Sequence, residues 1–222
     1  MNHQFNAVLF DLDGVVFDTE PQYSLFWGEV CRKFHPELPG LENKIKGQTL
    51  TQIFDGFFAD MPEAQKAIVK GLDDYERQMD YDYIPGFVDF MAMLKEKGVK
   101  TALVTSSNLP KMECVYRAHP ELGEFFDAIL TSEDFDESKP SPDCYLKAAK
   151  RLEVEIRQCI VCEDSFNGLR SGRAAGMAVL GLATTNARES IAELCDAVVD
   201  NFLTVDYSFC VELLRHHDSS FS

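Results

Sequence analysis

The sequence lacks long apolar runs, a signal-like start and internal repeats. Its apolar runs extend for only a handful of residues, far short of the ~20 that span a bilayer. No basic stretch followed by an apolar segment opens the chain, so no signal peptide is expected. No repeat or low-complexity tract is visible. We therefore expect a soluble, cytoplasmic protein that has no membrane partner.

Basic residues are also scarce. The 222 residues include 21 Lys or Arg against 37 Asp or Glu, which gives a net charge of −16 at pH 7. Nucleic-acid binding relies on clustered cations that displace counterions from phosphates, so this charge argues against a nucleic-acid partner. A small anionic substrate requires a local cation, either a metal or a lysine, to overcome the repulsion.

Cysteine and histidine, the usual ligands of zinc, form no recognisable site. The seven cysteines are scattered and odd in number, which in a chain without a secretion signal indicates reduced thiols. Cys159 and Cys162 form a CxxC, but no second pair completes a zinc site, so we interpret both as packing residues. His216 and His217 lie in a polar tail, where we expect them to be solvated.

Short apolar segments are present and alternate with helical patterns. The expected strands are Phe5–Phe10, Thr101–Val104, Ala128–Leu130, Cys159–Cys162 and Met177–Leu180. The expected helices that precede each of the later strands or lie between them are Val88–Lys97, Lys111–Ala118, Cys144–Leu152 and Ser165–Ala175. Strands separated by helices of this length are typical of βαβ units. The pattern predicts an α/β fold, with a doubly wound (Rossmann-like) parallel-sheet core.

A long block of helical periodicity separates the first expected strand from the second. Apolar residues recur at helical spacing through Thr51–Phe58 and Glu63–Met79, and no strand signal interrupts the block. We predict an inserted all-helical cap domain at residues 17–83. The catalytic core then consists of residues 1–16 and 84–222.

Polar side chains follow four of the expected strands. They are Asp11 and Asp13, Thr105–Ser107, Lys139 after a loop, and Glu163 with Asp164. In open parallel sheets, ligands bind at the carboxyl ends of the strands. Carboxylates, hydroxyls and a lysine at one sheet edge predict a cation site beside an anion site.

The carboxylates in this set favour a hard divalent cation. Asp11 and Asp13 are two positions apart, so in an extended segment their side chains share one side. Bringing them near Glu163 and Asp164 is costly because like charges repel. Mg²⁺ removes this cost, since it prefers oxygen ligands, and it also polarises an incoming phosphate.

Each motif alone has a simpler interpretation. Asp11-Leu12-Asp13-Gly14 also resembles the start of a calcium loop, but Val15 and Val16 stand where that loop requires a ligand and a glycine. Glu163-Asp164 alone is typical of a helix cap, and Lys139 alone of a solvated surface lysine. Their common position at strand ends favours the predicted cation and anion site over these simpler interpretations.

These residues carry a resemblance to the haloacid dehalogenase superfamily of phosphotransferases. The four segments similar to its motifs are Val8–Val15, Leu103–Ser107, Lys139–Asp143 and Val161–Ser165. Together with Phe17–Pro21, they resemble the subgroup that contains β-phosphoglucomutase and small sugar-phosphate phosphatases. The resemblance covers residues 5 to about 205. It is specific for the superfamily and much less so for the substrate.

The resemblance implies a role for each motif residue. Asp11 is implied as the nucleophile that forms an aspartyl-phosphate, and Asp13 as the general acid and base. The implied phosphate-binding groups are Thr105, the amide of Ser106, and Lys139. The implied cofactor is Mg²⁺, and its implied ligands are Asp11, the carbonyl of Asp13, Asp164, and Glu163 nearby or through water.

The resemblance also implies that a helical cap closes over the core and selects the substrate. The candidate specificity residues are Glu20, Tyr23, Lys46, Gly47, Gln48, Thr49 and Asn108. The expected partner is a small phosphorylated metabolite, most simply a sugar phosphate. We expect a monomer or a weak homodimer.

Three activities remain to be distinguished. The resemblance implies that a second acid at Asp13 argues against the dehalogenase branch, whose halide leaving group needs no proton, and against the phosphonate-cleaving branch, which also lacks this acid. Tyr23, Leu50 and Asn108 stand where the β-phosphoglucomutase pattern has ionisable residues, whereas Trp27 matches that pattern, as does Lys46. We therefore favour a phosphatase and keep a phosphomutase as the alternative. A non-enzymatic phosphoacceptor module is less favoured, since it needs neither Asp13 nor a cap.

Overall fold

A six-stranded sheet forms the centre of the computed structural model, which describes residues 5–46 and 48–219. The strands are β1 (Ala7–Phe10), β2 (Lys100–Val104), β3 (Ala128–Leu130), β4 (Cys159–Glu163), β5 (Ala178–Leu182) and β6 (Ala197–Val199). Their order is β3-β2-β1-β4-β5-β6, and every neighbouring pair is parallel. The predicted doubly wound core is confirmed.

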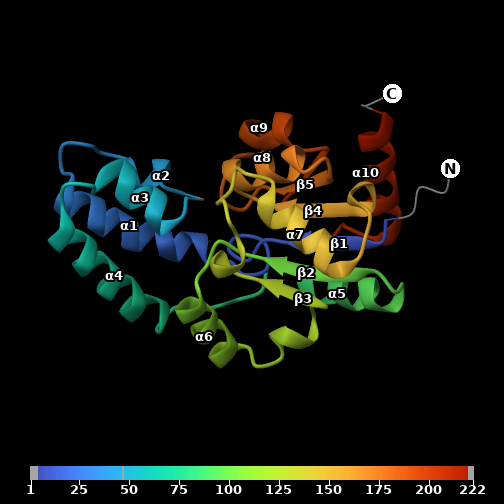
Figure 1. Ribbon diagram of the computed structural model, residues 1–222, viewed down its shortest axis with the longest axis horizontal. Coiled ribbons are helices and arrows are strands. Elements are labelled where there is room, and N and C mark those ends of the chain that lie inside the picture. The colour runs from blue at the N-terminus through green and yellow to red at the C-terminus, as the bar shows by residue number, and fades with distance from the viewer. Residues whose placement is uncertain (1–4, 47, 220–222) are drawn as a thin grey trace.

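Helices cover both faces of the sheet (Figure 1). One face packs against α5 (Phe87–Glu96), α6 (Leu109–Ala118) and α10 (Tyr207–Ser219). The other packs against α7 (Asp143–Leu152), α8 (Phe166–Ala174) and α9 (Arg188–Ile191). Single-turn 3₁₀ helices lie at Leu122–Glu124, Ser132–Asp134, Ile156–Gln158 and Ala192–Leu194.

The sequence of β1 is continuously apolar because both faces of this central strand are buried. Val8 and Phe10 point into the cluster beneath α5, whereas Ala7 and Leu9 point into the cluster beneath α7. A strand covered on both faces buries both sets of alternating side chains. β1 therefore lies in the middle of the sheet, and its carboxyl end delivers Asp11 to the middle of the edge.

The C-terminal part of the chain differs from the expectation. Residues Ala197–Val199 add the sixth strand, and the tail is the amphipathic helix α10, whose Leu213 and Leu214 are buried. The prediction that His217 is solvated is wrong: its Nδ1 lies 3.1 Å from both carboxylate oxygens of Asp196 and its exposure is 6%. His216 is exposed, as expected. Polar residues on the outer face concealed the apolar stripe of this helix.

The cysteines agree with the packing interpretation. Cys159 and Cys162 are buried in β4 and carry free thiols.

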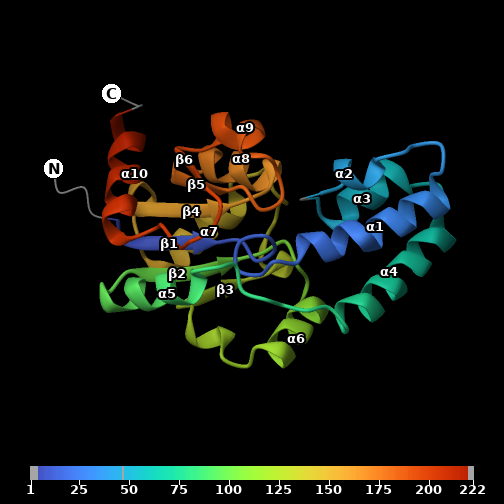
Figure 2. The ribbon, with the colours of Figure 1, turned by 180° about the vertical axis from the view of Figure 1, so that it is seen from behind.

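Four helices occupy the segment between β1 and α5. They are α1 (Glu20–Phe34), α2 (Leu41–Lys44), α3 (Leu50–Phe57) and α4 (Pro62–Glu76), and we call them the helical insert. They share an apolar core of their own, which includes Trp27, Ile53 and Phe58. Figures 1 and 2 show the insert as a lobe beside the sheet. In the described ranges, every helix is too short or too polar to cross a bilayer.

The insert leaves and rejoins the core at neighbouring points. Phe17 forms an antiparallel bridge with Tyr83, and their rings stack with centroids 4.8 Å apart. The amide of Asp18 donates to the carbonyl of Asp82 at 2.9 Å, and the amide of Ile84 donates to the carbonyl of Val16 at 2.9 Å. The two linkers are thus paired side by side.

Candidate active site

A cavity of about 510 Å³ lies between the carboxyl ends of the strands and the helical insert. The core contributes Asp11, Asp13, Thr105, Ser106, Ser107, Lys139 and Asp164 to its wall. The insert contributes Glu20, Tyr23, Trp27, Lys46 and Glu76, among others. The sheet edge that the sequence singled out is therefore also the floor of the cavity between the two lobes.

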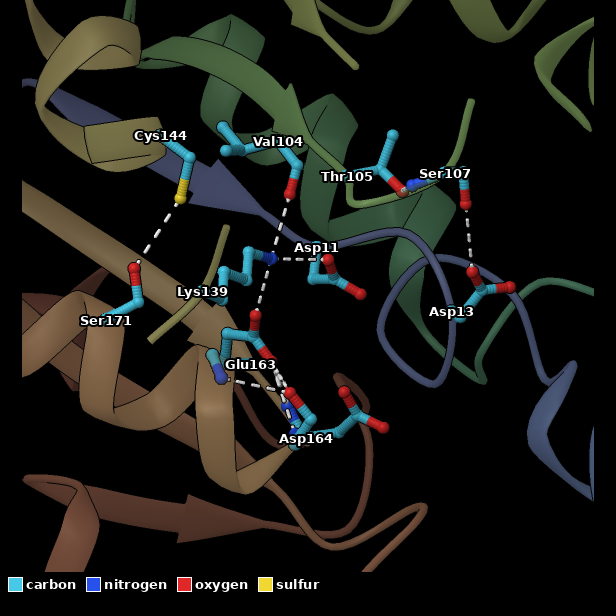
Figure 3. Close-up of polar contacts among 12 residues, drawn as sticks. Asp11, Asp13, Val104, Thr105, Ser107, Lys139, Cys144, Glu163, Asp164 and Ser171 are labelled. Carbon is cyan, nitrogen blue, oxygen red and sulfur yellow. Dashed lines mark hydrogen bonds and ion pairs between the residues drawn. The ribbon is translucent and has the colours of Figure 1, made fainter. Parts of the chain in front are cut away.

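Lys139 joins the ends of three strands (Figure 3). Its ammonium donates to Asp11 Oδ1 at 2.6 Å, to Glu163 Oε1 at 2.7 Å and to the carbonyl of Val104 at 3.1 Å. The side chain is only 4% exposed, which excludes the alternative of a solvated surface lysine that its position after a strand already disfavoured. Although burial lowers the pKa of Lys139, Asp11 and Glu163 raise it above its ordinary value. The ammonium therefore stays charged.

Glu163 is held from both ends of its carboxylate. Oε1 accepts from Lys139 and from the hydroxyl of Tyr145 at 2.9 Å. Oε2 accepts from the backbone amides of Asp164 at 3.0 Å and Ser165 at 3.2 Å. The space beside it is clear only because residue 168 is a glycine, since a Cβ there would overlap the Glu163 carboxylate. Because both oxygens of Glu163 already accept hydrogen bonds, a cation in the site would contact this carboxylate through water more readily than directly.

Asp164 lies on the other side of the acidic cluster. Its carboxylate accepts a hydrogen bond from the hydroxyl of Thr185. Gly14 has φ +72°, and a Cβ there would overlap this carboxylate. A glycine at the turn after β1 thus permits the left-handed backbone and lets the turn lie against Asp164.

Asp11, Glu163 and Asp164 offer oxygen atoms that all lie within 4.8 Å of one another. Three buried carboxylates against the one ammonium of Lys139 leave two negative charges unbalanced. Burial, together with Glu163 and Asp13, raises the pKa of Asp11 to about 7 even though Lys139 opposes the shift. Burial and Glu163 likewise raise the pKa of Asp164 well above its usual value. A divalent cation with oxygen ligands fits this donor set and this charge.

Asp13 faces a different set of groups, on the side of the cavity toward the insert. Oδ1 accepts from the hydroxyl of Thr19 at 2.6 Å. Oδ2 accepts from the hydroxyl of Ser107 at 3.3 Å and from the ammonium of Lys111. Its carboxylate thus has hydrogen-bond partners different from those of Asp11, although both residues follow β1.

The predicted phosphate-binding residues line the same cavity. Thr105 is 1% exposed, and its Oγ1 accepts from the amide of Ser107 at 3.0 Å. The amide of Thr105 itself donates to the carbonyl of Leu130 on β3 at 3.0 Å. The turn after β2 is fixed by these bonds, and it presents Ser106 to the cavity.

Six of the predicted specificity residues line the cavity, namely Glu20, Tyr23, Lys46, Gln48, Thr49 and Asn108. Gly47 lies outside the described residues. Two of the six also cap helices: Thr49 accepts from the amide of Gln52, and Asn108 accepts from the amide of Lys111. Their side-chain oxygens therefore already accept hydrogen bonds that stabilise the N-termini of α3 and α6.

Glu20 lies in surroundings that raise its pKa. Burial raises its pKa to about 7, the charge of Asp13 adds to the shift, and Lys46 and Lys111 oppose it. The wall formed by the insert contains further acids, since Glu42, Asp73 and Glu76 also line the cavity.

Sequence reasoning missed several residues of the site. Thr185 follows β5, so extending the strand-end argument to the fifth strand finds it. Lys111 lies in the first turn of the helix that follows the second motif, and Thr19 immediately precedes α1. Glu76 ends the helix α4 and meets Tyr23 across 53 positions. No sequence signal indicates this last pairing, which depends on how α4 packs on α1.

Comparison with known proteins agrees with the geometry. A profile described as "haloacid dehalogenase-like hydrolase" matches residues 5–176. A bifunctional riboflavin kinase/FMN phosphatase of Arabidopsis thaliana is 29% identical over 90% of this chain, which spans only 54% of that protein. β-Phosphoglucomutase of Bacillus subtilis is 29% identical over 79% of this chain and 82% of its own.

A solved structure also matches nearly the whole chain. The family IA, variant 3 HAD hydrolase of Entamoeba histolytica superimposes with a TM-score of 0.82 and 25% identity, covering 95% of this chain and 99% of its own. The profile spans most of the sequence and includes all four strand-end motifs. The chain therefore belongs to the haloacid dehalogenase-like hydrolases, a family of enzymes, as its motifs predict.

Proposed function

We propose that this protein is a Mg²⁺-dependent phosphatase that removes phosphate from a small phosphorylated metabolite, most simply a sugar phosphate, through an aspartyl-phosphate on Asp11. The observation that carries the proposal is the contact between Asp11 and Lys139 beside the buried acids Glu163 and Asp164. A carboxylate nucleophile, a fixed cation and a divalent-metal donor set are the groups that phosphoryl transfer needs at one place.

In the first step, a carboxylate oxygen of Asp11 forms a bond to phosphorus while the bond from phosphorus to the leaving oxygen breaks. Asp13 gives that oxygen a proton, because an alkoxide is a poor leaving group. Lys139 offsets the negative charge on the transferring group. Thr105 and the amide of Ser106 hold the phosphoryl oxygens.

In the second step, water attacks the phosphorus of the aspartyl-phosphate. Asp13, now a carboxylate, accepts a proton from this water. The bond between phosphorus and Asp11 breaks, which releases phosphate and restores the free carboxylate of Asp11. The same residue thus serves as acid and then as base.

The metal supplies charge neutralisation and polarises the phosphoryl oxygens. The residues that would hold it are Asp11, Asp164 and the carbonyl of Asp13, with Glu163 reaching it through water. The raised pKa values of Asp11 and Asp164 support this proposal, because a bound cation favours their ionised forms.

The charges of the cavity favour a phosphatase over a phosphomutase. Among the described residues, the cations that line it are Lys46, Lys111 and Lys139. Lys139 is paired with Asp11 and Lys111 with Asp13. A second phosphate, which a mutase must bind, would have Lys46 as its remaining cation and would meet the acids of the insert. The phosphomutase stays the alternative, since similar proteins include a β-phosphoglucomutase as well as a phosphatase.

We also propose that residues 17–83 form the cap domain and that residues 1–16 and 84–222 form the catalytic core. In this proposal the insert excludes water and selects the leaving group. The protein acts in the cytoplasm as a monomer or weak homodimer. Family membership favours an enzyme over a non-enzymatic phosphoacceptor module.

Phosphate release tests this function. The purified protein with Mg²⁺ would be supplied with sugar phosphates, nucleotides, pyrophosphate and phosphoglycolate, and the Asp11→Asn variant would serve as the control. We expect release from at least one sugar phosphate and none with the variant. The proposal is contradicted if the protein releases phosphate from none of these compounds.

A further inference from the structure

Lys111 is a buried lysine to which the family motifs assign no role. It lies in the first turn of α6, and its side chain is 6% exposed. Its ammonium contacts Asp13 Oδ2 and lies 4.6 Å from the centre of the Tyr23 ring. Burying an ammonium costs free energy unless charges or hydrogen bonds compensate it. An apolar side chain would fill the same space without this cost, so the charge itself calls for an explanation.

The donors around Asp13 are divided unequally between its two oxygens. Oδ2 accepts from both Lys111 and Ser107, whereas Oδ1 accepts from the hydroxyl of Thr19. A lysine ammonium can only donate, whereas a threonine hydroxyl can also accept. Oδ2 is therefore anchored, and Oδ1 is the oxygen whose partner can reverse its hydrogen bond when a proton arrives.

We propose that Lys111 is a positioning residue for Asp13: it anchors Oδ2, so that Oδ1 is the oxygen that exchanges the proton with the leaving group and with water. The inference rests on the proposed function, in which Asp13 is the acid and base. Lys111 acts through Asp13 and makes no bond to the transferring phosphoryl group.

The other contacts of Lys111 connect this anchor to the helical insert. Tyr23, whose ring lies against the ammonium, is on α1, and its hydroxyl donates to Glu76 Oε1 on α4 at 2.8 Å. Glu76 is itself buried, with 6% exposure. The ammonium therefore lies between the core carboxylate of Asp13 and an acidic residue of the insert. Lys111 therefore contacts both the Asp13 carboxylate of the core and the Tyr23 ring of the insert.

The expected effect of removing Lys111 depends on the leaving group. A sugar leaving oxygen needs the proton of Asp13, whereas p-nitrophenolate leaves without one. The quantity to compare is kcat/KM, because it reports the steps up to the transfer of the phosphoryl group and excludes the later attack of water. Lys111→Met should lower kcat/KM for glucose 6-phosphate by roughly 10–100-fold, which is part of the 10²–10⁴ that acid catalysis supplies. For p-nitrophenyl phosphate it should stay within about threefold.

A double-mutant cycle then tests whether Lys111 acts through Asp13. Lys111→Met, Asp13→Asn and the double variant would be assayed with glucose 6-phosphate and Mg²⁺. We expect the double variant to match Asp13→Asn within about twofold, because residues that act as a unit lose their effects together. Lys111→Arg keeps a charged donor and should recover most of the loss. Lys66→Met, which removes an exposed lysine of α4 paired with Glu63, should match the wild type.

The outcomes distinguish a failure of the proposed function from a failure of the proposed role of Lys111. Wild-type protein that hydrolyses neither ester nor any compound of the panel above contradicts the proposed function; if it hydrolyses another sugar phosphate of that panel, that ester replaces glucose 6-phosphate in the cycle. An active wild type with Lys111→Met unchanged on glucose 6-phosphate overturns only the role of Lys111. Equal losses on both esters, or independent losses that multiply in the double variant, also overturn it, because a general structural defect gives that pattern.

Discussion

Lys139 Nζ lies 2.6 Å from Asp11 Oδ1, although 128 positions separate the two residues in the chain. The same ammonium contacts Glu163 and the carbonyl of Val104, so it connects the ends of β1, β2 and β4. These three strands are neighbours at the centre of the sheet. The site is therefore complete only when the central strands have paired.

Replacing the nucleophile should abolish turnover and preserve the fold. Asp11→Asn keeps the shape of the side chain but removes both the nucleophilic carboxylate and a strong metal ligand. We expect phosphate release below about one-thousandth of the wild-type rate, with an unchanged circular dichroism spectrum. Activity within tenfold of the wild type contradicts the role of Asp11.

Chelation should remove activity, and Mg²⁺ should restore it better than Ca²⁺. Three buried carboxylates meet one ammonium, so the site needs added positive charge. Mg²⁺ imposes short bonds and octahedral geometry, whereas Ca²⁺ takes more ligands at longer distances and would displace the phosphate. The measurement is phosphate release after EDTA treatment and titration with each ion. Full activity after exhaustive chelation would exclude the proposed metal dependence.

The cavity charges predict hydrolysis instead of isomerisation. With β-glucose 1-phosphate and a trace of the 1,6-bisphosphate, the protein should release phosphate and form little glucose 6-phosphate. Tyr23, Leu50 and Asn108 line the cavity without a formal charge. Lys46 offers a point charge and not the bidentate contact of an arginine. Rapid formation of glucose 6-phosphate with negligible phosphate would establish the mutase instead.

Gly168→Ala should disturb Glu163. A Cβ at residue 168 would overlap the Glu163 carboxylate, which Lys139 and Tyr145 hold in place. We expect a loss of about 1–3 kcal/mol in unfolding free energy and a higher Mg²⁺ concentration for half-maximal activity. Gly56→Ala is the matched control, because a Cβ there meets nothing within 4 Å. Equal behaviour of the two variants in denaturant titrations would rule out this packing argument.

His217 should make stability depend on pH. Its hydrogen bond to Asp196 raises the pKa of His217 above 6.5, although burial opposes the shift. A raised pKa means that the folded state holds the proton more tightly, so the stabilisation is complete below about pH 6.5 and is lost as pH rises through the folded-state pKa. The pKa of Asp196 is lowered despite burial because it accepts from His217 and from the amide of Val179, so its own contribution is lost only at acidic pH.

The measurement is the melting temperature of His217→Gln relative to the wild type at pH 6.0 and 8.5. We expect the variant to lose about 1 kcal/mol more at pH 6.0, which is ~2–4 °C for a chain of this size. Arg215→Gln, a charge removal on the same helix, should have the same effect at both pH values. An equal loss for His217→Gln at both pH values would contradict the linkage.

The sequence predicted the strand-end residues because parallel strands bring their carboxyl ends to one edge. Asp11, Lys139 and Asp164 could thus be placed together without knowledge of the side-chain contacts. The burial of Lys139 could not be predicted, since it depends on the loop after β3 folding back over Val104. A lysine in isolation gives no sign of whether water or protein surrounds it.

The residues that the sequence did not predict depend on packing between elements. Lys111 reaches Asp13 because α6 lies beside the turn after β1, and Glu76 reaches Tyr23 because α4 packs on α1. His217 is buried because α10 packs on one face of the sheet next to Asp196. Helix periodicity indicates which face of a helix is buried, but not which residue of another element it meets.

The pairing of Phe17 with Tyr83 has a consequence for the inserts that this core can accommodate. Because the two linkers lie side by side, the span between their ends is independent of what the insert contains. The entropy of closing such a loop grows only with the logarithm of its length. Inserts of other sizes can therefore be grafted between β1 and β2 while the sheet edge with Asp11 and Lys139 is inherited intact. The pocket wall can thus change in length and sequence without a change in the core residues beneath it.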